Sequence, residues 1–435
     1  MRTFIKILLS VFLVLLLLAA ATLYGFYWYE NNVDRSGWAI ENGIYSYKDF
    51  YGDPVTGWQK IDGSQYYFFP DDATMATYWQ EIDGNRYYFS GDGTLDTGLW
   101  SIDGKTYYLG DDGAMQRGWL DMEGSRYYMG EDGTMQYGWQ EIEGQRYHFR
   151  DTGAMDTGFV ILDGQTYRFL DNGPLFTGWD VVDEQLVYYL PEGPRATGWQ
   201  KIDGKLYYFE KNGAMQTGWL SLGENDYYLQ EDGSAAIGPT EIDGELRYFG
   251  PQGIHVVLVN SEHKVPKWYT MELKTVQDWN QVSTVCYSAL VNMLSDCNAA
   301  GIEYTFNSAY RTIAQQQDIL DARTKEYEDK GSDHTTAYWK ARQTVALPGT
   351  SEHHLGLAVD LLGEEAIAWL TEHCWEYGFI VRYREEKAHI TGIIDEPWHF
   401  RYVGVDVAMD MKDSGLCLEE YLGAVPVDTG TEPQT

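Results

Sequence analysis

A motif of about twenty residues returns throughout the first half of the chain, and it constrains the fold more than any other feature. One copy reads "TGWQKIDGKLYYFEKNGAMQ" from Thr197. Its leading aromatic residue recurs at Trp58, Trp79, Trp100, Trp119, Trp139, Phe159, Trp179, Trp199 and Trp219. Such a period is typical of a repeat architecture, in which each unit contacts only its neighbours.

Each repeat has the pattern of a β-hairpin. "DG" or "EG" supplies a tight turn between two short aromatic-rich runs, and a second turn follows at "KNG" or "DDG". One hairpin cannot bury its aromatic face in water, so we expect about ten units to stack as a β-hairpin solenoid over residues 31–250. The terminal units should be degenerate caps: the copy from Ser36 is loose, and Pro239 stands where tryptophan is expected.

The chain is strongly acidic. Its 435 residues carry a formal net charge of −35, and residues 31–250 hold 37 Asp and Glu against 15 Lys and Arg. With 44% hydrophobic and 15% aromatic residues, the chain is too apolar for global disorder. The sequence shows no basic patch that could neutralise phosphates, so nucleic acid is not an expected partner.

The N-terminal segment predicts a membrane helix. Residues 7–28 form an uncharged run of 22 residues, enough to cross a hydrocarbon core of about 30 Å. Arg2 and Lys6 precede the run and an aromatic belt closes it, so the N-terminus should be cytoplasmic. We therefore expect residues 1–30 to be a cytoplasmic stub and an uncleaved anchor. The alternative is a cleaved signal peptide ending near Ala21, which would also export the rest of the chain.

A different pattern begins near residue 254. Residues 254–422 are predicted to form an α+β domain, and residues 423–435 a polar tail. The expected helices are 276–299, 312–328 and 364–378. The expected strands are 302–310, 357–362, 379–384, 388–394 and 396–404.

All four cysteines fall in this C-terminal part, and no two of them form a CxxC pair. Cys286 and Cys297 are too far apart on one predicted helix to share a disulfide. Any bridge would have to use Cys374 or Cys417.

Two short segments of this domain carry metal-ligand chemistry. "GTSEHHLGLAVD" contains His353 and Asp360, whose opposite parity would send them to opposite faces of one regular strand. The segment must therefore bend, and Gly356 is the natural turn. "EPWH" supplies a third ligand, His399, with Glu396 three residues before it. Two imidazoles and a carboxylate suit Zn²⁺ and leave a fourth position for water.

The repeats resemble the cell-wall-binding repeats of Gram-positive surface proteins, a family that includes choline-binding modules and glucan-binding repeats. "TGW", "IDG", "YYF" and "GAM" recur together through about half the chain. In choline-binding modules a tryptophan before the tyrosine pair helps to form an aromatic cage for a quaternary ammonium. That place here holds Gln65, Arg86, Thr106, Arg126, Arg146, Thr166, Leu206 and Asp226. Two ligands stay open, choline-bearing teichoic acid and a wall glycan, and a third interpretation makes the array a spacer with an aromatic core.

The C-terminal domain resembles the VanY-like zinc D-alanyl-D-alanine carboxypeptidases. "SEHHLGLAVD" matches their S-x-H-x-x-G-x-A-x-D signature and "EPWHFRYVG" their E-x-W-H signature. "NSAYRT" resembles their S-G-Y-R-S element, with Ala309 in place of glycine. The resemblance covers roughly residues 254–405 and implies zinc ligands at His353, Asp360 and His399, with Glu396 as the general base.

The same resemblance implies substrate contacts. Arg311 would polarise the scissile carbonyl, and Ser351, Tyr310 and Gln316 would bind substrate. Arg311 could instead pair with one of the many acidic groups. H-E-x-x-H does not occur, which excludes the common zincin helix.

An exported domain of this family beside wall-binding repeats would remove the terminal D-alanine from peptidoglycan stem peptides. Two alternatives remain: an L,D-carboxypeptidase that trims tetrapeptide stems with the same metal centre, and a non-catalytic wall adhesin, against which the intact ligand set argues. The expected partners are stem peptides, wall glycan or choline-bearing teichoic acid through the repeats, and the membrane through the N-terminal helix. The catalytic domain should lie outside the plasma membrane of a Gram-positive cell, or be secreted and wall-bound if the signal is cleaved.

Overall fold

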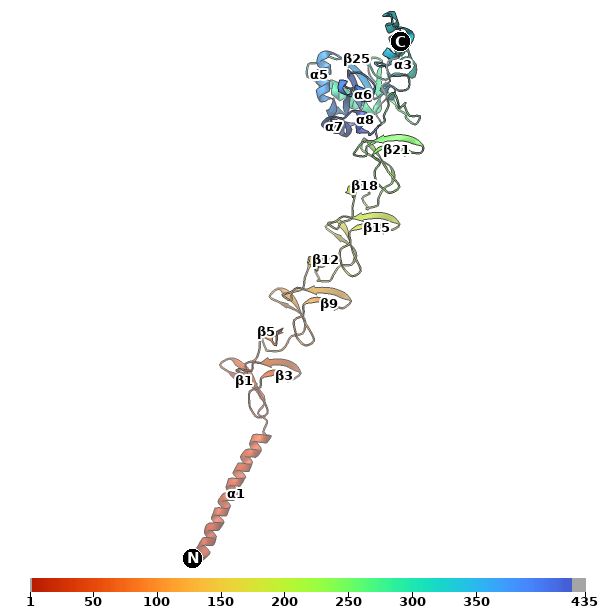
Figure 1. The fold of residues 1–435 in the computed structure, drawn as a ribbon. Helices are drawn as coiled ribbons and strands as arrows, with labels where there is room; N and C mark the ends of the chain where they lie inside the picture. Colours follow the sequence, from red (N-terminus) through yellow and green to blue (C-terminus); the bar gives the residue numbers. More distant parts are fainter. Residues whose placement is uncertain (1, 425–435) are drawn as a thin grey trace. The chain divides into compact units, whose positions relative to one another are not determined.

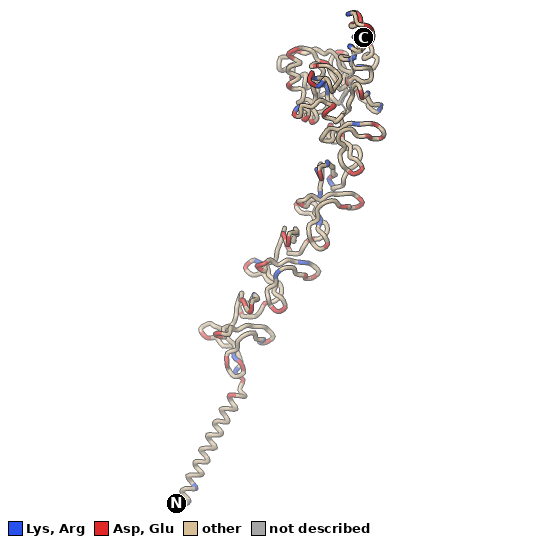
Figure 2. The backbone as a smooth tube through the Cα atoms, in the orientation of Figure 1, with Lys and Arg blue, Asp and Glu red and all other residues tan. Residues whose placement is uncertain are grey.

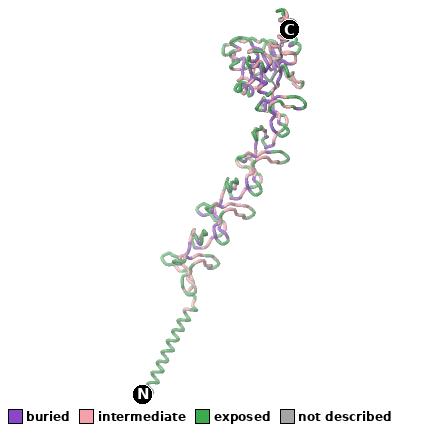
Figure 3. Tube along the Cα trace, viewed as in Figure 1, coloured by how far each residue is buried: buried purple, intermediate pink, exposed green. Residues whose placement is uncertain are grey.

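The computed structural model describes residues 2–424 and begins with a long helix, α1 (Arg2–Asn32) (Figure 1). Within the described chain α1 is the one helix long and apolar enough to cross a membrane. Its apolar side chains are exposed along its whole length (Figure 3). The predicted apolar helix is therefore present and carries no protein packing of its own. From residue 425 onward, the predicted polar tail lies outside the described residues.

Eleven β-hairpins follow α1, each made of two consecutive strands. The strands are β1 (Gly37–Glu41), β2 (Ile44–Lys48), β3 (Gly57–Ile61), β4 (Ser64–Phe68), β5 (Tyr78–Ile82), β6 (Asn85–Phe89), β7 (Gly98–Ile102), β8 (Lys105–Leu109), β9 (Gly118–Met122), β10 (Ser125–Met129), β11 (Gly138–Ile142), β12 (Gln145–Phe149), β13 (Gly158–Leu162), β14 (Gln165–Phe169), β15 (Gly178–Val182), β16 (Gln185–Tyr189), β17 (Gly198–Ile202), β18 (Lys205–Phe209), β19 (Gly218–Leu222), β20 (Asn225–Leu229), β21 (Gly238–Ile242) and β22 (Glu245–Phe249). The predicted hairpin repeats are confirmed. Figure 2 shows acidic residues distributed along the whole array of hairpins rather than gathered in one segment.

The turn sequence explains the tightness of each hairpin. In β17–β18, Asp203 and Gly204 form the two-residue turn with φ of 49° and 82°. Positive φ at both positions defines the type I′ turn, whose twist matches that of the paired strands. Aspartate and glycine tolerate this left-handed region, so "DG" sets the register of the aromatic residues on both strands.

Neighbouring hairpins are joined by backbone hydrogen bonds and aromatic contacts. The Met115 amide donates to the Arg86 carbonyl at 2.8 Å, from the turn after one hairpin to the second strand of the hairpin before it. The Trp119 ring lies 5.0 Å from Tyr128 on its own hairpin and 5.0 Å from Tyr147 on the next. Each repeat thus covers the aromatic face of its neighbour, as the repeat pattern predicts.

One member of the predicted tryptophan series is out of phase. In β7–β8, Leu99 faces Tyr108, the position that Trp119 and its equivalents occupy, whereas Trp100 faces Tyr107. Because alternate residues of a strand point to opposite faces, this shift of one residue turns Trp100 away from the shared aromatic face. Trp100 instead donates its indole N–H to the Thr97 carbonyl at 2.9 Å. The predicted aromatic position at Trp100 is therefore wrong for this repeat.

The chain divides into two compact units, one formed by residues up to Gly178 with Tyr189–Arg195, the other by Trp179–Tyr188 with the chain from Ala196 onward. The second unit holds most of hairpin β15–β16, the three hairpins that follow it and the C-terminal α+β region. In it, Tyr227 and Tyr248 of the hairpins share a buried cluster with Val407 and Leu418 of the C-terminal helices.

The C-terminal region is built on a four-stranded antiparallel sheet in the order β25-β26-β28-β27. The strands of this sheet are β25 (Thr305–Ser308), β26 (Ala358–Leu362), β27 (Phe379–Tyr383) and β28 (Glu396–Tyr402). Two further strands of the region, β23 (Leu273–Gln277) and β24 (Asn280–Ser283), form a separate hairpin. The helices of the region are α2 (Thr284–Ala299), α3 (Ile313–Asp329), α4 (His334–Ala341), η1 (Glu352–Leu355), α5 (Glu364–His373), η2 (Cys374–Tyr377), η3 (Glu385–Lys387), α6 (Ala388–Thr391), α7 (Val405–Ser414) and α8 (Leu418–Tyr421). The predicted α+β class is confirmed.

Three sequence predictions for this region are wrong in detail. Residues 276–283, expected in a helix, complete the hairpin β23–β24, and α2 begins only after the Ser283 side chain caps it. Within residues 388–394, expected as a strand, Ala388–Thr391 form the short helix α6, which is capped by Gly392 with φ of 74°. Helix α4 lies in a stretch where the sequence predicted neither a helix nor a strand. In each case local composition was ambiguous and capping or tertiary packing decided the structure.

All four cysteines are buried and free. Cys286 and Cys297 do share helix α2. As predicted, their separation along the helix is too great for a disulfide between them.

Candidate metal centre and aromatic repeats

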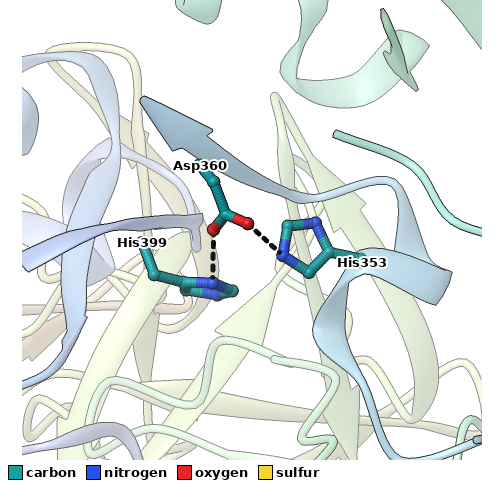
Figure 4. Close-up of side chains that lie close together, drawn as sticks. All are labelled: His353, Asp360 and His399. Carbon is teal, nitrogen blue, oxygen red and sulfur yellow. Dashed lines mark hydrogen bonds and ion pairs between the residues drawn. The ribbon is translucent and has the colours of Figure 1, made fainter. Parts of the chain in front are cut away.

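A bend in the chain brings the predicted ligands together. His353 lies in η1, Gly356 follows with φ of 66°, and Asp360 lies on β26. β26 pairs with β28 so that Asp360 faces His399. The turn at Gly356 therefore resolves the opposite parity of His353 and Asp360, as the sequence predicts, and all three side chains converge in the interior (Figure 4).

The three side chains have the spacing of an open metal site. One ligand atom from each of His353, Asp360 and His399 lies within 4.8 Å of the others. The Nε2 atom of His353 is 3.3 Å from Oδ2 of Asp360, and Nδ1 of His399 is 3.0 Å from Oδ1 of the same carboxylate. None of the three is more than 4% exposed. Two imidazoles and one carboxylate in this arrangement match a zinc site with a free coordination position.

The second nitrogen of each imidazole is held by an acceptor. Nδ1 of His353 lies 2.6 Å from the Ala309 carbonyl. Nε2 of His399 lies 3.4 Å from Oε2 of Glu352. Such partners fix the tautomer and the ring orientation that a metal ligand needs. The donor set and its supports therefore fit a zinc ion.

The metal-free centre holds its proton on one imidazole. Burial lowers the pKa of His353 to about 4. Burial would also lower the pKa of His399, but its interactions with Asp360 and Glu352 outweigh burial and raise the pKa to about 9. For Asp360 the nearby imidazoles outweigh burial and lower the pKa. A metal bound at His399 would have to displace that proton, which makes metal affinity depend on pH.

Glu396 stands beside the cluster without belonging to it. Its Oε2 atom is 4.0 Å from Nδ1 of His399. Burial raises the pKa of Glu396 to about 7, close to the value that suits a general base at neutral pH. This position separates it from the three ligand atoms, as expected for a base.

Arg311 both approaches the centre and forms an ion pair. Its Nη2 donates to Oδ2 of Asp360 at 2.6 Å and its Nε donates to Oγ of Ser308 at 2.6 Å. Burial lowers the pKa of the Arg311 guanidinium, against the attraction of Asp360 and Glu396. The acidic partner that the sequence left open is thus Asp360, one of the three predicted metal ligands.

A cleft of about 430 Å³ opens over the cluster. Ser351 and Gln316 line it together with Arg311 and Glu396. Gln316 is fully buried and accepts from Nη1 of Arg311 at 3.2 Å, so it holds the arginine in place. Tyr310 is not among the described residues that line this cleft; its amide donates to the Gln281 carbonyl at 2.9 Å.

Comparison with known proteins agrees with this centre. A family model described as D-alanyl-D-alanine carboxypeptidase, VanY, matches residues 280–405. A bifunctional D-Ala-D-Ala dipeptidase and D-Ala-D-Ala carboxypeptidase of Enterococcus gallinarum is 38% identical over 140 residues, which are 28% of this chain and 69% of that protein. The chain belongs to the VanY family of D-alanyl-D-alanine carboxypeptidases.

Further VanY-family relatives match the same region. A D-alanyl-D-alanine carboxypeptidase of Enterococcus faecalis is 40% identical over 174 residues, 38% of this chain and 65% of that protein. This chain therefore spans slightly less than two thirds of that relative. A crystal structure of the D,D-pentapeptidase VanY in complex with Zn(II) is 40% identical, with a TM-score of 0.37, and covers 38% of this chain and 97% of its own.

The repeats match two further family models. A choline-binding repeat matches residues 55–95 and 176–217, and a cell wall binding repeat matches residues 99–115, 138–155 and 217–235. A VanY-type domain is thus preceded by cell-wall-binding repeats, as the sequence indicated.

Sequence reasoning missed Glu352, the residue inside the VanY signature that supports His399. Glu352 is 1% exposed. Its Oε1 atom lies 2.8 Å from Nε of Arg382 and 2.9 Å from Nη1 of Arg401. Arg382 also binds Glu419 on α8, with Nη2 2.6 Å from Oε1. Its place next to His353 was visible in the sequence, but its two arginine partners are far away along the chain.

Arginine side chains lie on the aromatic faces of several repeats. We call the tryptophan of a repeat, the tyrosine opposite it and the tyrosine of the next repeat an aromatic step. The guanidinium carbon of Arg126 lies 4.6 Å from the Trp119 ring centroid. Arg86 over Trp79 (4.2 Å) and Arg146 over Trp139 (4.7 Å) repeat the arrangement. In these repeats the chain's own cation contacts the tryptophan ring by cation–π attraction.

Other aromatic steps have no arginine at that place. The equivalent position carries Gln65 in the step of Trp58, Leu186 in that of Trp179 and Leu206 in that of Trp199. The Trp179 ring lies 5.0 Å from Tyr188 and 5.2 Å from Tyr207. The array therefore contains two kinds of step, one filled by the chain's own arginine and one without a cation at the equivalent position.

Proposed function

We propose that the chain is a zinc-dependent D,D-carboxypeptidase that removes the terminal D-alanine from peptidoglycan stem peptides. The observation that carries this proposal is the convergence of His353, Asp360 and His399 under an open cleft, with Glu396 4.0 Å from His399. The relatives' names describe the same activity for those proteins.

The chain's residues divide the chemistry among them. His353, Asp360 and His399 would hold zinc, which when bound supplies Lewis-acid polarisation of a carbonyl and lowers the pKa of water. Glu396 accepts the proton of the attacking water and returns it to the leaving amine. Arg311, held by Ser308 and Gln316, stabilises the negative charge that develops on the carbonyl oxygen.

The substrate test compares two stem peptides. We expect the zinc-loaded protein to release D-alanine from pentapeptide muropeptides and to leave tetrapeptide muropeptides intact, because the proposed activity cleaves a D-Ala-D-Ala bond. Mass spectrometry of the products, each one alanine lighter if cleaved, measures both reactions. Cleavage of the tetrapeptide alone would establish the L,D-carboxypeptidase instead, and cleavage of neither would favour the non-catalytic adhesin.

The repeats and α1 support a location of this activity at the cell surface. The cell-wall-binding repeats and the N-terminal apolar helix indicate a surface protein, membrane-anchored or secreted. We propose that α1 is retained as an anchor, since its apolar run spans a bilayer and ends in aromatic residues. An intact N-terminus in mass spectra of the membrane fraction supports the anchor, and a mature chain starting near Thr22 contradicts it.

The repeats are proposed to hold wall polymer at the steps that carry no arginine. Trp179→Ala should weaken retention on purified walls about fivefold. A lost cation–π or stacking contact costs roughly one kcal/mol of binding free energy, which corresponds to that factor. Trp119→Ala is the matched control and should change retention less than twofold, because Arg126 already covers that ring. Co-sedimentation of the full chain with walls, with and without free choline, measures both variants. Equal effects of the two variants would contradict the distinction, and elution by choline would identify a quaternary ammonium ligand.

A further inference from the structure

Trp279 has the most exposed large apolar side chain of the described residues. It is 84% exposed, against 71% for Phe4, the most exposed such residue of α1. Exposing a tryptophan to this degree forgoes about 2 kcal/mol or more of hydrophobic stabilisation. Single exposed apolar side chains are common on protein surfaces, but a tryptophan exposed to this degree offers a rigid apolar face to a ligand.

The fold does not require tryptophan at this position. Trp279 is the second residue of the two-residue turn between β23 and β24, where Gln277 faces Asn280. Asp278 takes the left-handed conformation of the turn, with φ of 51°. Small polar residues are favoured at such turn positions. A tryptophan side chain there contributes no packing to the core.

The hairpin β23–β24 is attached to the wall of the metal centre. The Gln281 carbonyl accepts the amide hydrogen of Tyr310 at 2.9 Å. Tyr310 lies between Ala309, whose carbonyl holds His353, and Arg311, which lines the cleft. The path from Trp279 to Arg311 runs two residues along the strand to Gln281, across its hydrogen bond to Tyr310, and one peptide unit further. The Cα atoms of Trp279 and Arg311 are therefore no more than about 16 Å apart.

We propose that Trp279 is a stacking platform for a sugar ring of the wall glycan that carries the stem peptide. The inference rests on the proposed function. When the last bond of a pentapeptide stem is cleaved, four residues separate the scissile carbonyl from the sugar. Four extended residues span about 14 Å, comparable with the limit of about 16 Å on the separation of the Trp279 and Arg311 Cα atoms. A substrate in the cleft can therefore bring its own sugar within reach of this tryptophan.

The surroundings of Trp279 suit a sugar better than a lipid surface. Asp278 and Asn280 flank it in the chain, and a membrane-binding face would need a cluster of apolar side chains and basic residues. A pyranose presents one apolar face and a rim of hydroxyl groups. The indole offers a rigid apolar face, and the Asp278 carboxylate beside it can accept hydrogen bonds from hydroxyls.

The test compares two substrates that differ only in the sugar. The zinc-loaded full chain is assayed on a disaccharide-pentapeptide and on the free pentapeptide. Trp279→Ala should lower kcat/KM on the disaccharide-pentapeptide about fivefold to tenfold, through KM, and change it less than twofold on the free peptide. Trp279→Phe should restore most of the loss. Met409→Ala removes another exposed apolar side chain, on α7, and should leave both substrates unaffected.

The outcomes separate this proposal from the proposed function. If the unmodified protein cleaves neither substrate, the carboxypeptidase assignment fails and the sugar platform falls with it. If it cleaves both and Trp279→Ala loses the same factor on each, or loses nothing, the sugar platform alone is wrong. Binding of the protein to phosphatidylglycerol vesicles that disappears in Trp279→Ala would also overturn it, in favour of a membrane contact.

Discussion

Glu396→Gln should lower the rate of D-alanine release by about 10²-fold to 10⁴-fold while the protein keeps its zinc. Glutamine preserves the size and hydrogen bonding of the side chain but cannot accept the proton of the attacking water. Glu396 is 4.0 Å from His399 and outside the group of three ligand atoms, so its replacement leaves the ligand set complete. Zinc content by atomic absorption and turnover of a pentapeptide muropeptide measure the two effects separately.

His399→Ala is the matched control for that experiment. It removes one of three protein ligands, so zinc occupancy itself should fall, and stability with it because metal binding is coupled to folding. Circular dichroism of both variants must first show a folded protein. Near-normal turnover of Glu396→Gln, or loss of its zinc to the same extent as in His399→Ala, would show that Glu396 is not the base.

Arg382→Met should destabilise the folded protein by about 3–5 kcal/mol, the cost of removing one partner from a buried charge pair. Arg382 is 1% exposed and binds both Glu352 and Glu419. Its loss leaves Glu352 with Arg401 as its remaining arginine partner and Glu419 with the Asn260 amide, 3.0 Å away. The free energy of unfolding in urea, followed by circular dichroism on zinc-loaded protein, measures the change.

Arg384→Met provides the comparison, two residues along the chain. The Arg384 side chain is 28% exposed, its Nη1 lies 3.5 Å from Glu386, and its Nη2 donates to the carbonyls of Gly415 and Leu416 at 3.1 and 3.2 Å. A partly exposed ion pair contributes little and a hydrogen bond about 1 kcal/mol, so we expect a loss of about 1–2 kcal/mol, below that of Arg382→Met. Similar losses for the two variants would mean that the buried network does not carry the stability assigned to it.

The sequence predicted the parts of the structure that rest on local pattern. The turn chemistry of "DG" and the aromatic alternation were enough for the hairpins, and the bend at Gly356 followed from the parity of His353 and Asp360. The convergence of His353, Asp360 and His399 was predictable because short motifs contain them, and β26 and β28 then pair Asp360 with His399.

The remaining features depend on contacts between distant parts of the chain. Glu352 is held by Arg382 and Arg401, and no local pattern connects residues 30 and 49 positions apart. The hairpin β23–β24 resembled the start of helix α2, because its short strands continue directly into the helical sequence. The stacking of Arg126 on Trp119 could not be derived from the repeat period. The pairing of β9 with β10 places both residues on one face of the hairpin. The long arginine side chain has several rotamers, however, and most do not lie on the tryptophan ring.

The bonds between neighbouring hairpins also have a mechanical meaning. In the described repeats, backbone hydrogen bonds between hairpins run from one unit to the next, as from Met115 to Arg86 or from Met135 to Thr106. A pulling force on a chain fixed at both ends could therefore unravel one unit while the others hold. A released unit of about twenty residues extends to roughly 70 Å. The array can thus lengthen in steps under load and shorten again as units refold, because each unit contacts only its neighbours.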